Sequence, residues 1–372
     1  MANYVAVLLL GIVSKINGHE VMSGEHLDHR GCGTEHYMED MLAKDPEWKA
    51  KLDQFEIDFA LRQNKIKSGE LSPAVNSVTI PVVYHIVYNT NAQNVPDSTI
   101  AYQNNRLQAD FSATNTDYGS TPSAFTSPVD LRSGDFGFTV VNDQVIRKAT
   151  STSSFGANNN IKFDSSGGSS VVSPASKLNF WSGALSGGLL GYAQFPGGNP
   201  NTDGVVQLWS SLSPEVGGNS PYNLGRTGTH EIGHWLNLRH IWGDSNSCTI
   251  NDGVNDTPAQ SGPNFGCPSP NNARLSCPSQ NPYPYDMYCN YMDYVNDACM
   301  VMFSRGQYDR AWASIFQFRQ GFNPSSIITA DVEYINWLYF DDFDQEITNN
   351  DDKCYFGFNL FYEGNLNENS NS

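Results

Sequence analysis

The stretch HEIGHWLNLRH, residues 230–240, places three histidines and one glutamate within eleven positions. On a helix, His230 and His234 are four positions apart and project from one face, so their imidazoles can bind a single Zn²⁺ ion. Glu231 lies beside them, where a carboxylate can accept a proton from water. Chance produces this pattern, third histidine included, in roughly one of several thousand such sequences. The stretch therefore predicts a zinc site.

The third histidine, His240, requires the helix to end. It follows His234 by six positions, and a continuing helix would direct it about 240° away from the first two imidazoles. The chain must turn back at a residue that tolerates positive φ, which is usually glycine. Asparagine is the next most tolerant residue. We therefore expect the bend at Asn237.

Composition limits the classes of partner. The chain has 372 residues, and 39 acidic against 21 basic side chains give a net charge of −18. Such a charge excludes nucleic acid and anionic membrane surfaces as favoured partners. No apolar run reaches the roughly 20 residues that a membrane span needs, so we expect no membrane insertion.

The N-terminus and the cysteines indicate secretion. The apolar run Val5–Val13 has the length of a signal peptide, which would cover residues 1–18. A buried N-terminal strand is the alternative for this run. Five of the seven cysteines fall between Cys248 and Cys299, as in proteins of oxidising compartments. The predicted location is extracellular.

The pattern along the chain predicts mixed α/β layers. Residues 37–65 have helical spacing, and a polar linker follows them. The predicted strands and helices alternate thereafter, and they are 77–90 (strand), 97–111 (helix), 135–141, 177–183, 187–198 and 203–212 (strands), 224–238 and 303–319 (helices). Residues 187–198 are bracketed by glycine pairs and are typical of an exposed edge strand. Residues 242–299 are expected to be irregular, and the tail beyond 341 partly disordered.

Two motifs carry a family resemblance. HEIGHWLNLRHIWGD and NYMDYVNDACMVMFSRGQ together resemble the pappalysin family of metzincin metallopeptidases, in particular its ulilysin-like (cytophagalysin) branch, over roughly residues 72–320. The resemblance implies an α+β metzincin fold with a twisted mixed sheet, an exposed edge strand, two long helices and an irregular, disulfide-bonded C-terminal subdomain. Met292 would form the floor beneath the metal, and Tyr294 would stabilise the transition state. Without the resemblance, both would be ordinary core residues, and His85 is a core or surface histidine in either case.

The resemblance also implies an activity. A zinc endopeptidase of this kind would bind its metal through His230, His234 and His240 and use Glu231 as the base. The edge strand would hold an extended peptide or protein substrate by strand addition through Leu190, Gly191, Tyr192, Ala193 and Gln194. Asp297 would line a pocket for a basic residue after the scissile bond. We expect a monomer. The alternative function is a secreted, non-catalytic zinc-containing binding or adhesion protein.

The string RGCGT places Cys32 upstream of the strand-rich region. A thiolate is a good fourth zinc ligand, and the string resembles the inhibitory prosegments of ulilysin-like enzymes. Cys32 would then hold a zymogen latent, and the alternative is a stray or disulfide-bonded cysteine. The expected division is a prosegment at 19–72, a catalytic domain at 73–340 and an extension at 341–372. Activation would cleave the chain between Lys65 and Ser77.

The sequence also leads us to expect three disulfide bonds and a calcium-binding loop. The resemblance implies the pairs Cys248–Cys277 and Cys267–Cys299, and the two remaining cysteines suggest a third bond, Cys289–Cys354. The loop CTINDGVNDTPAQ corresponds to a calcium-binding loop of ulilysin-like enzymes. Its candidate calcium ligands are Asp252, Asp256 and Thr257, and a merely solvated loop is the alternative.

Overall fold

The longest strand, β1 (Val75–Tyr88), forms the centre of a mixed sheet. The structure, a computed structural model, describes residues 30–70 and 75–327. The β-branched and aromatic run 78–87 favours an extended chain. Residues 82–87 are all buried because both faces of the sheet are covered. The expected signal segment, Cys354 and the tail beyond 341 lie outside the described residues.

The sheet has the strand order β2-β1-β3-β5-β4. β1 pairs in parallel with β2 (Phe138–Ala149) and β3 (Leu178–Gly183), and β3 pairs in parallel with β5 (Val205–Leu208). The edge strand β4 (Gly191–Ala193) is antiparallel to β5, and β6 (Ser325–Ile327) pairs antiparallel with the start of β1. The predicted mixed sheet with an edge strand at 187–198 is therefore confirmed.

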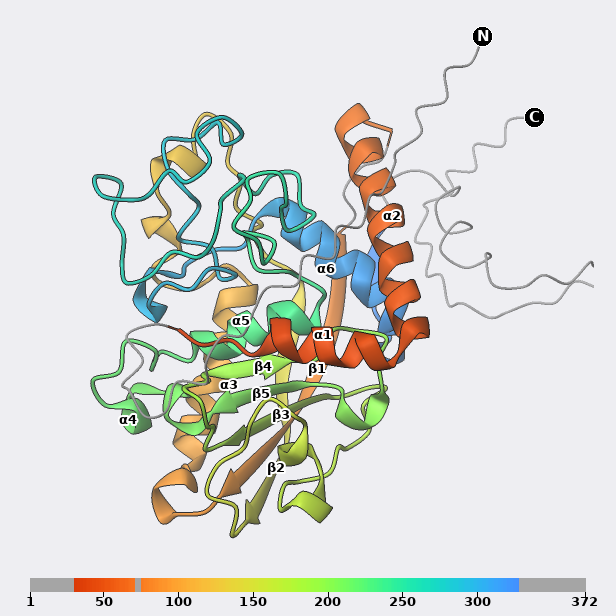
Figure 1. Ribbon diagram of the computed structural model, residues 1–372, viewed down its shortest axis with the longest axis vertical. Coiled ribbons are helices and arrows are strands. Elements are labelled where there is room, and N and C mark those ends of the chain that lie inside the picture. Colours follow the sequence, from red (N-terminus) through yellow and green to blue (C-terminus); the bar gives the residue numbers. More distant parts are fainter. Residues whose placement is uncertain (1–29, 71–74, 328–372) are drawn as a thin grey trace, which may run out of the picture. The chain divides into compact units, whose positions relative to one another are not determined.

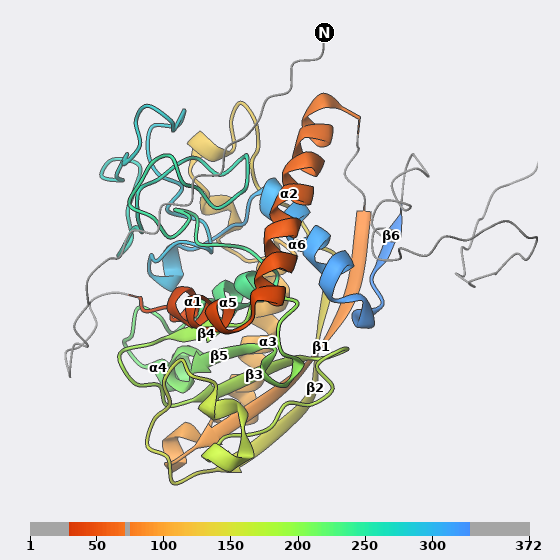
Figure 2. The ribbon, with the colours of Figure 1, turned by 45° about the vertical axis from the view of Figure 1, so that its right-hand side comes forward.

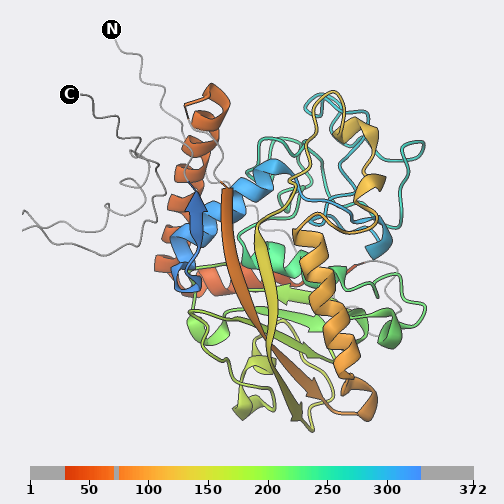
Figure 3. The same cartoon turned by 180° about the vertical axis from the view of Figure 1, so that it is seen from behind.

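One face of the sheet packs against helices (Figure 3). These are α3 (Asp97–Phe111) and α5 (Arg226–Trp235), with the short α4 (Pro214–Gly217) nearby. α6 (Arg305–Phe318) follows later in the chain and begins with a capping box. The helix predicted at 97–111 has the expected bounds. The second long helix is shorter than the prediction of 224–238, because it ends at Trp235 to allow the metal-site bend.

The other face is covered in part by the N-terminal segment, which we define as residues 30–70, and in part by residues 155–171. It forms two helices, α1 (Thr34–Lys44) and α2 (Pro46–Ser68), where the spacing predicted one. Asp45 separates them, because its side chain accepts a hydrogen bond from the backbone of Trp48 and Pro46 occupies the first helical turn. Figures 1 and 2 show α1 along β4 and α2 beside α6.

This segment completes a second hydrophobic core. Four of its side chains pack with the outward face of the sheet in one buried cluster, and they are Tyr37, Met38, Trp48 and Leu52. Trp181 and Tyr192 are their main aromatic neighbours from the strands. Burial of large aromatic and aliphatic side chains stabilises a contact by about 1.5–3 kcal/mol for each residue. The N-terminal segment is thus an integral part of the fold as described.

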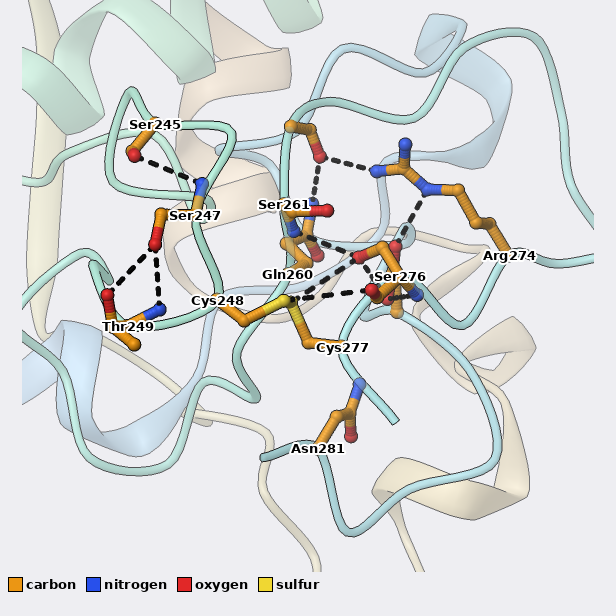
Figure 4. The surroundings of a disulfide bond; sticks show 12 residues. Ser245, Ser247, Cys248, Thr249, Gln260, Ser261, Arg274, Ser276, Cys277 and Asn281 are labelled. Carbon is orange, nitrogen blue, oxygen red and sulfur yellow. Dashed lines mark hydrogen bonds and ion pairs between the residues drawn. A yellow bond between two sulfur atoms is a disulfide. The ribbon is translucent and has the colours of Figure 1, made fainter. Parts of the chain in front are cut away.

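Residues between α5 and α6 form the irregular subdomain that the sequence predicted. Disulfides join Cys248 to Cys277 and Cys267 to Cys299, the two pairs that the family resemblance implied. Figure 4 shows the first bond beside Ser276 and Arg274, whose side chains both bond Asp286. Cys289 is buried and forms no disulfide with another described residue. Its expected partner, Cys354, falls outside the described residues.

Among residues 30–70 and 75–327, no helix combines the length and apolar character that crossing a membrane requires.

Candidate active site

Helix α5 brings the first two histidines together. His230 and His234 lie one turn apart, and their Nε2 atoms are 3.2 Å from each other. Their rings are perpendicular, with centroids 4.8 Å apart. Both side chains are buried. Two imidazole nitrogens facing each other at this distance, without a proton between them, form half of a metal site.

The chain turns at Asn237, as the sequence predicted. Its φ is 71°, in the left-handed region. The Asn237 amide donates to the carbonyl of His234 at 2.8 Å, and Leu238 donates to Gly233 at 2.9 Å, so the bonds that close the helix are satisfied. The bend returns His240 to the first two ligands, with its Nε2 3.1 Å from that of His234.

Each ligand histidine has an acceptor for its other nitrogen. His230 Nδ1 donates to the carbonyl of Tyr291 at 2.7 Å, and His234 Nδ1 donates to that of Leu238 at 2.8 Å. His240 Nδ1 instead bonds the carboxylate of Asp244. Because a carbonyl can only accept, Nδ1 carries the proton and the Nε2 lone pair is free for a metal. Asp244 is not among the residues predicted from the sequence, although its position four residues after His240, in HIWGD, was a signal.

Electrostatics keeps the first two imidazoles neutral. Burial lowers the pKa of His230, and it lowers that of His234 to about 3, with the neighbouring imidazoles acting in the same direction. Burial also lowers the pKa of His240, but the charge and hydrogen bond of Asp244 outweigh it, so the net shift is upward. Asp244 therefore makes His240 the most basic of the three imidazoles.

Met292 and Tyr294 both lie at the site. Met292 is fully buried beneath α5, where a side chain at Gly233 would come within 2.4 Å of its sulfur. Its carbonyl accepts from the Ile241 amide at 3.2 Å, which ties the turn to the helix bend. The Tyr294 ring is 4.9 Å from the ring of His240. Met292 thus has the position of a floor, and Tyr294 that of a neighbour to the metal ligands.

Glu231 is buried beside the histidines and the edge strand. Its Oε1 lies so close to β4 that a Cβ on Gly191 would approach it to 2.7 Å. Oε2 accepts a hydrogen bond from the Thr34 hydroxyl at 3.1 Å. Burial raises the pKa of Glu231 to about 7, against the lowering effect of the bonds from Cys32 and Thr34. A carboxyl with this pKa can both accept and donate a proton near neutral pH.

Cys32 faces the same point. Its Sγ is 3.5 Å from Nε2 of His234 and 3.6 Å from Oε2 of Glu231. The sulfur and the ligand nitrogens of His230, His234 and His240 all lie within 4.8 Å of one another. The four donors fit a metal ion of coordination number four. The thiol forms no disulfide with a described residue.

The N-terminal segment pairs with the free edge of β4. Cys32 and Gly191 form a parallel bridge. Gly33 donates to the carbonyl of Gly191 at 2.9 Å, and Leu190 donates to that of Gly31 at 2.7 Å. The Ala193 amide donates to the Thr34 hydroxyl at 2.9 Å. The edge strand that the sequence predicted as exposed is therefore covered by residues 31–34. Its backbone groups, which we expected to bind substrate, form hydrogen bonds with these residues.

Asp297 lies at the base of a buried pocket that Arg30 fills. The Arg30 guanidinium forms an ion pair with Oδ1 of Asp297 and donates to the Thr227 hydroxyl at 3.1 Å. It also packs on the ring of Tyr222 at 5.0 Å. Oδ2 of Asp297 accepts from the backbone amide of Leu224 at 2.8 Å, which fixes the carboxylate. Asp297, Thr227 and Tyr222 therefore enclose the Arg30 guanidinium.

The calcium candidates are only partly brought together. The Thr257 hydroxyl donates to Oδ1 of Asp252 at 2.7 Å, and Oδ2 of Asp252 is buried without a hydrogen-bond partner in the described chain. Burial raises the pKa of Asp252 to about 7. Asp256 instead accepts from Ser304 and from the Gly306 amide at the start of α6. Calcium binding by this loop stays a prediction.

His85 is a core histidine. It is buried in β1, where its ring nitrogens lie 2.8 Å from the Ser169 hydroxyl and 2.9 Å from the Asn179 amide oxygen. It contacts none of the ligand histidines, so its expected structural role is confirmed.

The chain resembles known metalloproteases in sequence. The family model described as Peptidase_M43, pregnancy-associated plasma protein-A, matches residues 191–315. An extracellular metalloprotease of Arthroderma benhamiae is 30% identical over 273 residues, which cover 72% of this chain and 89% of the relative. One from Arthroderma otae is 32% identical over 270 residues, covering 72% and 88%.

Solved structures give the same result. Mature mirolysin of Tannerella forsythia in complex with a cleaved peptide is 41% identical, with a TM-score of 0.59 over 64% of this chain and 91% of that one. A promirolysin mutant of the same organism is 39% identical, with a TM-score of 0.65 over 79% and 95%. The second match extends further along this chain than the first. These matches show that the chain belongs to the pappalysin family of metzincin metallopeptidases.

Proposed function

We propose that this metallopeptidase is a secreted zinc endopeptidase made as a latent precursor, in which Cys32 fills the fourth coordination position. The observation that carries the proposal is the convergence of Cys32 Sγ with the ligand nitrogens of His230, His234 and His240, all within 4.8 Å. Three histidines and a glutamate in HEIGHWLNLRH favour catalysis over structure, because structural zinc sites use four permanent protein ligands.

The donor distances support zinc. Zn–N bonds of about 2.0–2.1 Å in a tetrahedron separate two nitrogens by about 3.3 Å, and a Zn–S bond of about 2.3 Å separates sulfur from nitrogen by about 3.5 Å. Nε2 of His234 lies 3.2 Å from that of His230, 3.1 Å from that of His240 and 3.5 Å from Sγ of Cys32. The residues present thus fit the ion.

The chain's own groups divide the catalytic work. Zn²⁺ bound there supplies a Lewis acid for peptide hydrolysis. Glu231 accepts the proton of the attacking water and passes it to the leaving amine nitrogen. Tyr294 supports the developing oxyanion from beside His240, and Met292 holds the floor of the site. Gly191 permits the approach of Glu231 to the edge strand, so that base and substrate backbone meet.

The N-terminal segment is the described part of the proposed prosegment, residues 19–72, and it would block three functions at once. Cys32 occupies the metal position, Thr34 occupies the base, and residues 31–34 occupy the edge strand. Cleavage between Lys65 and Ser77 would release it from the catalytic domain, 73–340. Residues 1–18 are the proposed signal peptide and 341–372 a C-terminal extension. Relatives that are named extracellular metalloproteases support secretion.

The Asp297 pocket supports a substrate class. In the precursor it holds Arg30, two residues before the thiol that faces the metal site. A substrate with arginine or lysine after the scissile bond would place its cation in the same pocket. We propose that the enzyme cuts extended peptides before a basic residue.

The test compares four preparations of the full chain, namely wild type before and after processing, Glu231→Ala, and Cys32→Ala. Processed wild type should digest casein, lose activity with phenanthroline and regain it with Zn²⁺. Glu231→Ala should lose roughly 10²–10⁴-fold in rate while retaining zinc. Cys32→Ala should be active without processing.

Undiminished activity of Glu231→Ala would remove the proposed base. Continued latency of Cys32→Ala would remove the switch. Zinc retention without any hydrolysis in processed wild type would favour the non-catalytic binding protein.

A further inference from the structure

Tyr37, in the N-terminal segment, is recognised by its hydroxyl. The side chain is 2% exposed. Its hydroxyl donates to Oε1 of Gln194 at 3.0 Å and accepts from Nδ2 of Asn159 at 3.1 Å. Both partners belong to the part of the chain that follows the proposed cleavage region. The hydroxyl thus bonds one donor and one acceptor of the catalytic domain, and a phenyl ring would lose both hydrogen bonds.

The ring of Tyr37 is held as specifically as its hydroxyl. It packs against Tyr192 with centroids 5.3 Å apart. The ammonium nitrogen of Lys162 lies 5.3 Å from the centroid of Tyr37 and 5.1 Å from that of Tyr192, distances at which a cation attracts an aromatic face. We call the walls formed by Asn159, Lys162, Tyr192 and Gln194 the Tyr37 pocket.

The walls are fixed by bonds that do not involve the N-terminal segment. Nε2 of Gln194 donates to the carbonyl of Asn199 at 2.9 Å, and its Oε1 accepts from the Thr202 hydroxyl at 2.5 Å. Lys162 donates to the carbonyl of Thr202 at 2.7 Å. None of these three bonds uses a residue of the N-terminal segment, so its removal breaks none of them directly, and the pocket is preorganised for another occupant.

The pocket adjoins the strand that the proposed substrate would extend. Gly191 faces Glu231, and side chains alternate along a strand, so Tyr192 and Gln194 project from the opposite face of the sheet. A substrate strand added to β4 would likewise direct alternate side chains over that face. An occupant of the Tyr37 pocket can therefore belong to a chain that also reaches the metal site.

The positions of three residues of the N-terminal segment show on which side of the metal site the Tyr37 pocket lies. Arg30 fills the pocket of Asp297, Cys32 faces the ligand histidines, and Tyr37 lies beyond them in the same segment. If the Asp297 pocket receives the residue after the scissile bond, the Tyr37 pocket lies on the amino-terminal side of that bond.

We propose that in the processed enzyme the Tyr37 pocket binds a tyrosine side chain of the substrate, on the amino-terminal side of the scissile bond. This inference rests on the proposed peptidase function and deepens it. The preferred substrate has two anchors, a tyrosine before the cut and a basic residue after it. The N-terminal segment occupies both pockets in the precursor.

The experiment uses enzyme processed from the full chain and an alanine-rich peptide with arginine after the scissile bond. Tyrosine, phenylalanine or alanine is placed in turn at each of the four preceding positions. One position should show kcat/KM at least about tenfold higher for tyrosine than for alanine and about fivefold higher than for phenylalanine, the value of one hydrogen bond. Equal values for tyrosine and phenylalanine at every position would overturn the proposal.

A variant of Asn159 tests whether the Tyr37 pocket causes the preference for tyrosine over phenylalanine. Asn159 has a φ of 66°, so Asn159→Gly removes the amide without straining the backbone. It should reduce the tyrosine-to-phenylalanine ratio to about 1. The matched control is Asn158→Gly at the exposed neighbouring position, which should keep the ratio. Melting temperatures check that both variants fold. A ratio unchanged in Asn159→Gly would also overturn the assignment.

A peptide-binding assay tests the Tyr37 pocket independently of the proposed peptidase activity. If no peptide is cut, the peptidase proposal fails, and the pocket is tested with a labelled peptide of residues 30–44 on the processed protein. Tyr37→Phe in that peptide should weaken binding about fivefold on the wild-type protein and have no effect on Asn159→Gly. Equal binding of both peptides to the wild-type protein would overturn the pocket on its own.

Discussion

The Thr34 hydroxyl donates a 3.1 Å hydrogen bond to Oε2 of Glu231, so the N-terminal segment engages the proposed base as well as the metal position. The same hydroxyl accepts from the Ala193 amide at 2.9 Å. A single side chain therefore joins the base to the edge strand, next in space to the thiol. In the proposed precursor, latency would then depend on Thr34 as well as on Cys32.

Thr34→Val should raise the basal activity of the precursor. Valine has the shape of threonine but cannot bond Glu231, and a hydrogen bond to a charged group contributes about 1.5–3 kcal/mol. We expect basal peptide hydrolysis to rise about tenfold, measured in purified precursor before processing. Thr34→Ser keeps the hydroxyl and should stay latent. Equal activity of the two variants would show that Thr34 is not part of the latch.

Glu56→Gln should accelerate release of the N-terminal segment. Glu56 on α2 bonds Arg310, which is buried, and its Oε1 lies 2.8 Å from Arg239. The variant keeps the shape but loses two ion pairs, so activation followed by gel and peptide hydrolysis should be faster at neutral pH. Asp53→Asn on the exposed side of the same helix should activate like wild type.

The ion pairs of Glu56 with Arg310 and Arg239 predict that the effect of Glu56→Gln on activation depends on pH. Burial opposes ionisation of Glu56, but the bonds and charges of Arg310 and Arg239 outweigh it and lower its pKa below the usual value. A depressed carboxyl pKa contributes stability that is complete above the unfolded pKa and is lost as the pH falls through the folded pKa. The difference in activation rate between wild type and Glu56→Gln should therefore disappear on acidification. A difference that persists at low pH would contradict this role.

Asp244→Asn should weaken metal binding. Asp244 bonds Nδ1 of His240 and has a φ of 54°, a conformation that asparagine also tolerates. The substitution removes the negative charge and keeps the backbone. Loss of such a partner costs roughly 10–100-fold in metal affinity, which a chelator titration with measurement of bound zinc would detect. Wild-type zinc retention would argue against a role for the charge.

Asn237→Ala should destabilise the bend, and Asn237→Gly should not. The φ of 71° costs a residue with a Cβ about 1–2 kcal/mol unless, like asparagine, it favours the left-handed region. The side-chain Nδ2 of Asn237 has no hydrogen-bond partner among the described residues, so its loss costs little. Thermal melting and zinc content of the two variants check the prediction. Equal melting temperatures would show that backbone strain is not what the asparagine relieves.

Local patterns carried most of the correct predictions. The i, i+4 spacing of His230 and His234 fixes their common face on any helix, and the need for positive φ identifies Asn237, because both follow from backbone geometry within a few residues. The β-branched run of β1 and the glycine-bracketed edge strand were predictable for the same reason.

The predicted helix bounds were wrong where contacts or caps, rather than the spacing of apolar residues, decide where a helix ends. Helix α5 is shorter than its pattern because His240 must return to the site. The N-terminal segment forms two helices because Asp45 caps the second and Pro46 begins it. Hydrophobic periodicity alone predicts neither the end of α5 nor the break between α1 and α2.

The sequence by itself determined the bend and the close grouping of the three candidate ligand histidines and the candidate base, because those residues lie within eleven positions and their geometry is that of one helix and one turn. Only the tertiary structure decided that Cys32 and Thr34 meet Glu231, and that Arg30 meets Asp297, across 197 to 267 residues of chain. Such contacts depend on how the sheet edge and the N-terminal segment pack, and packing is a property of the whole fold.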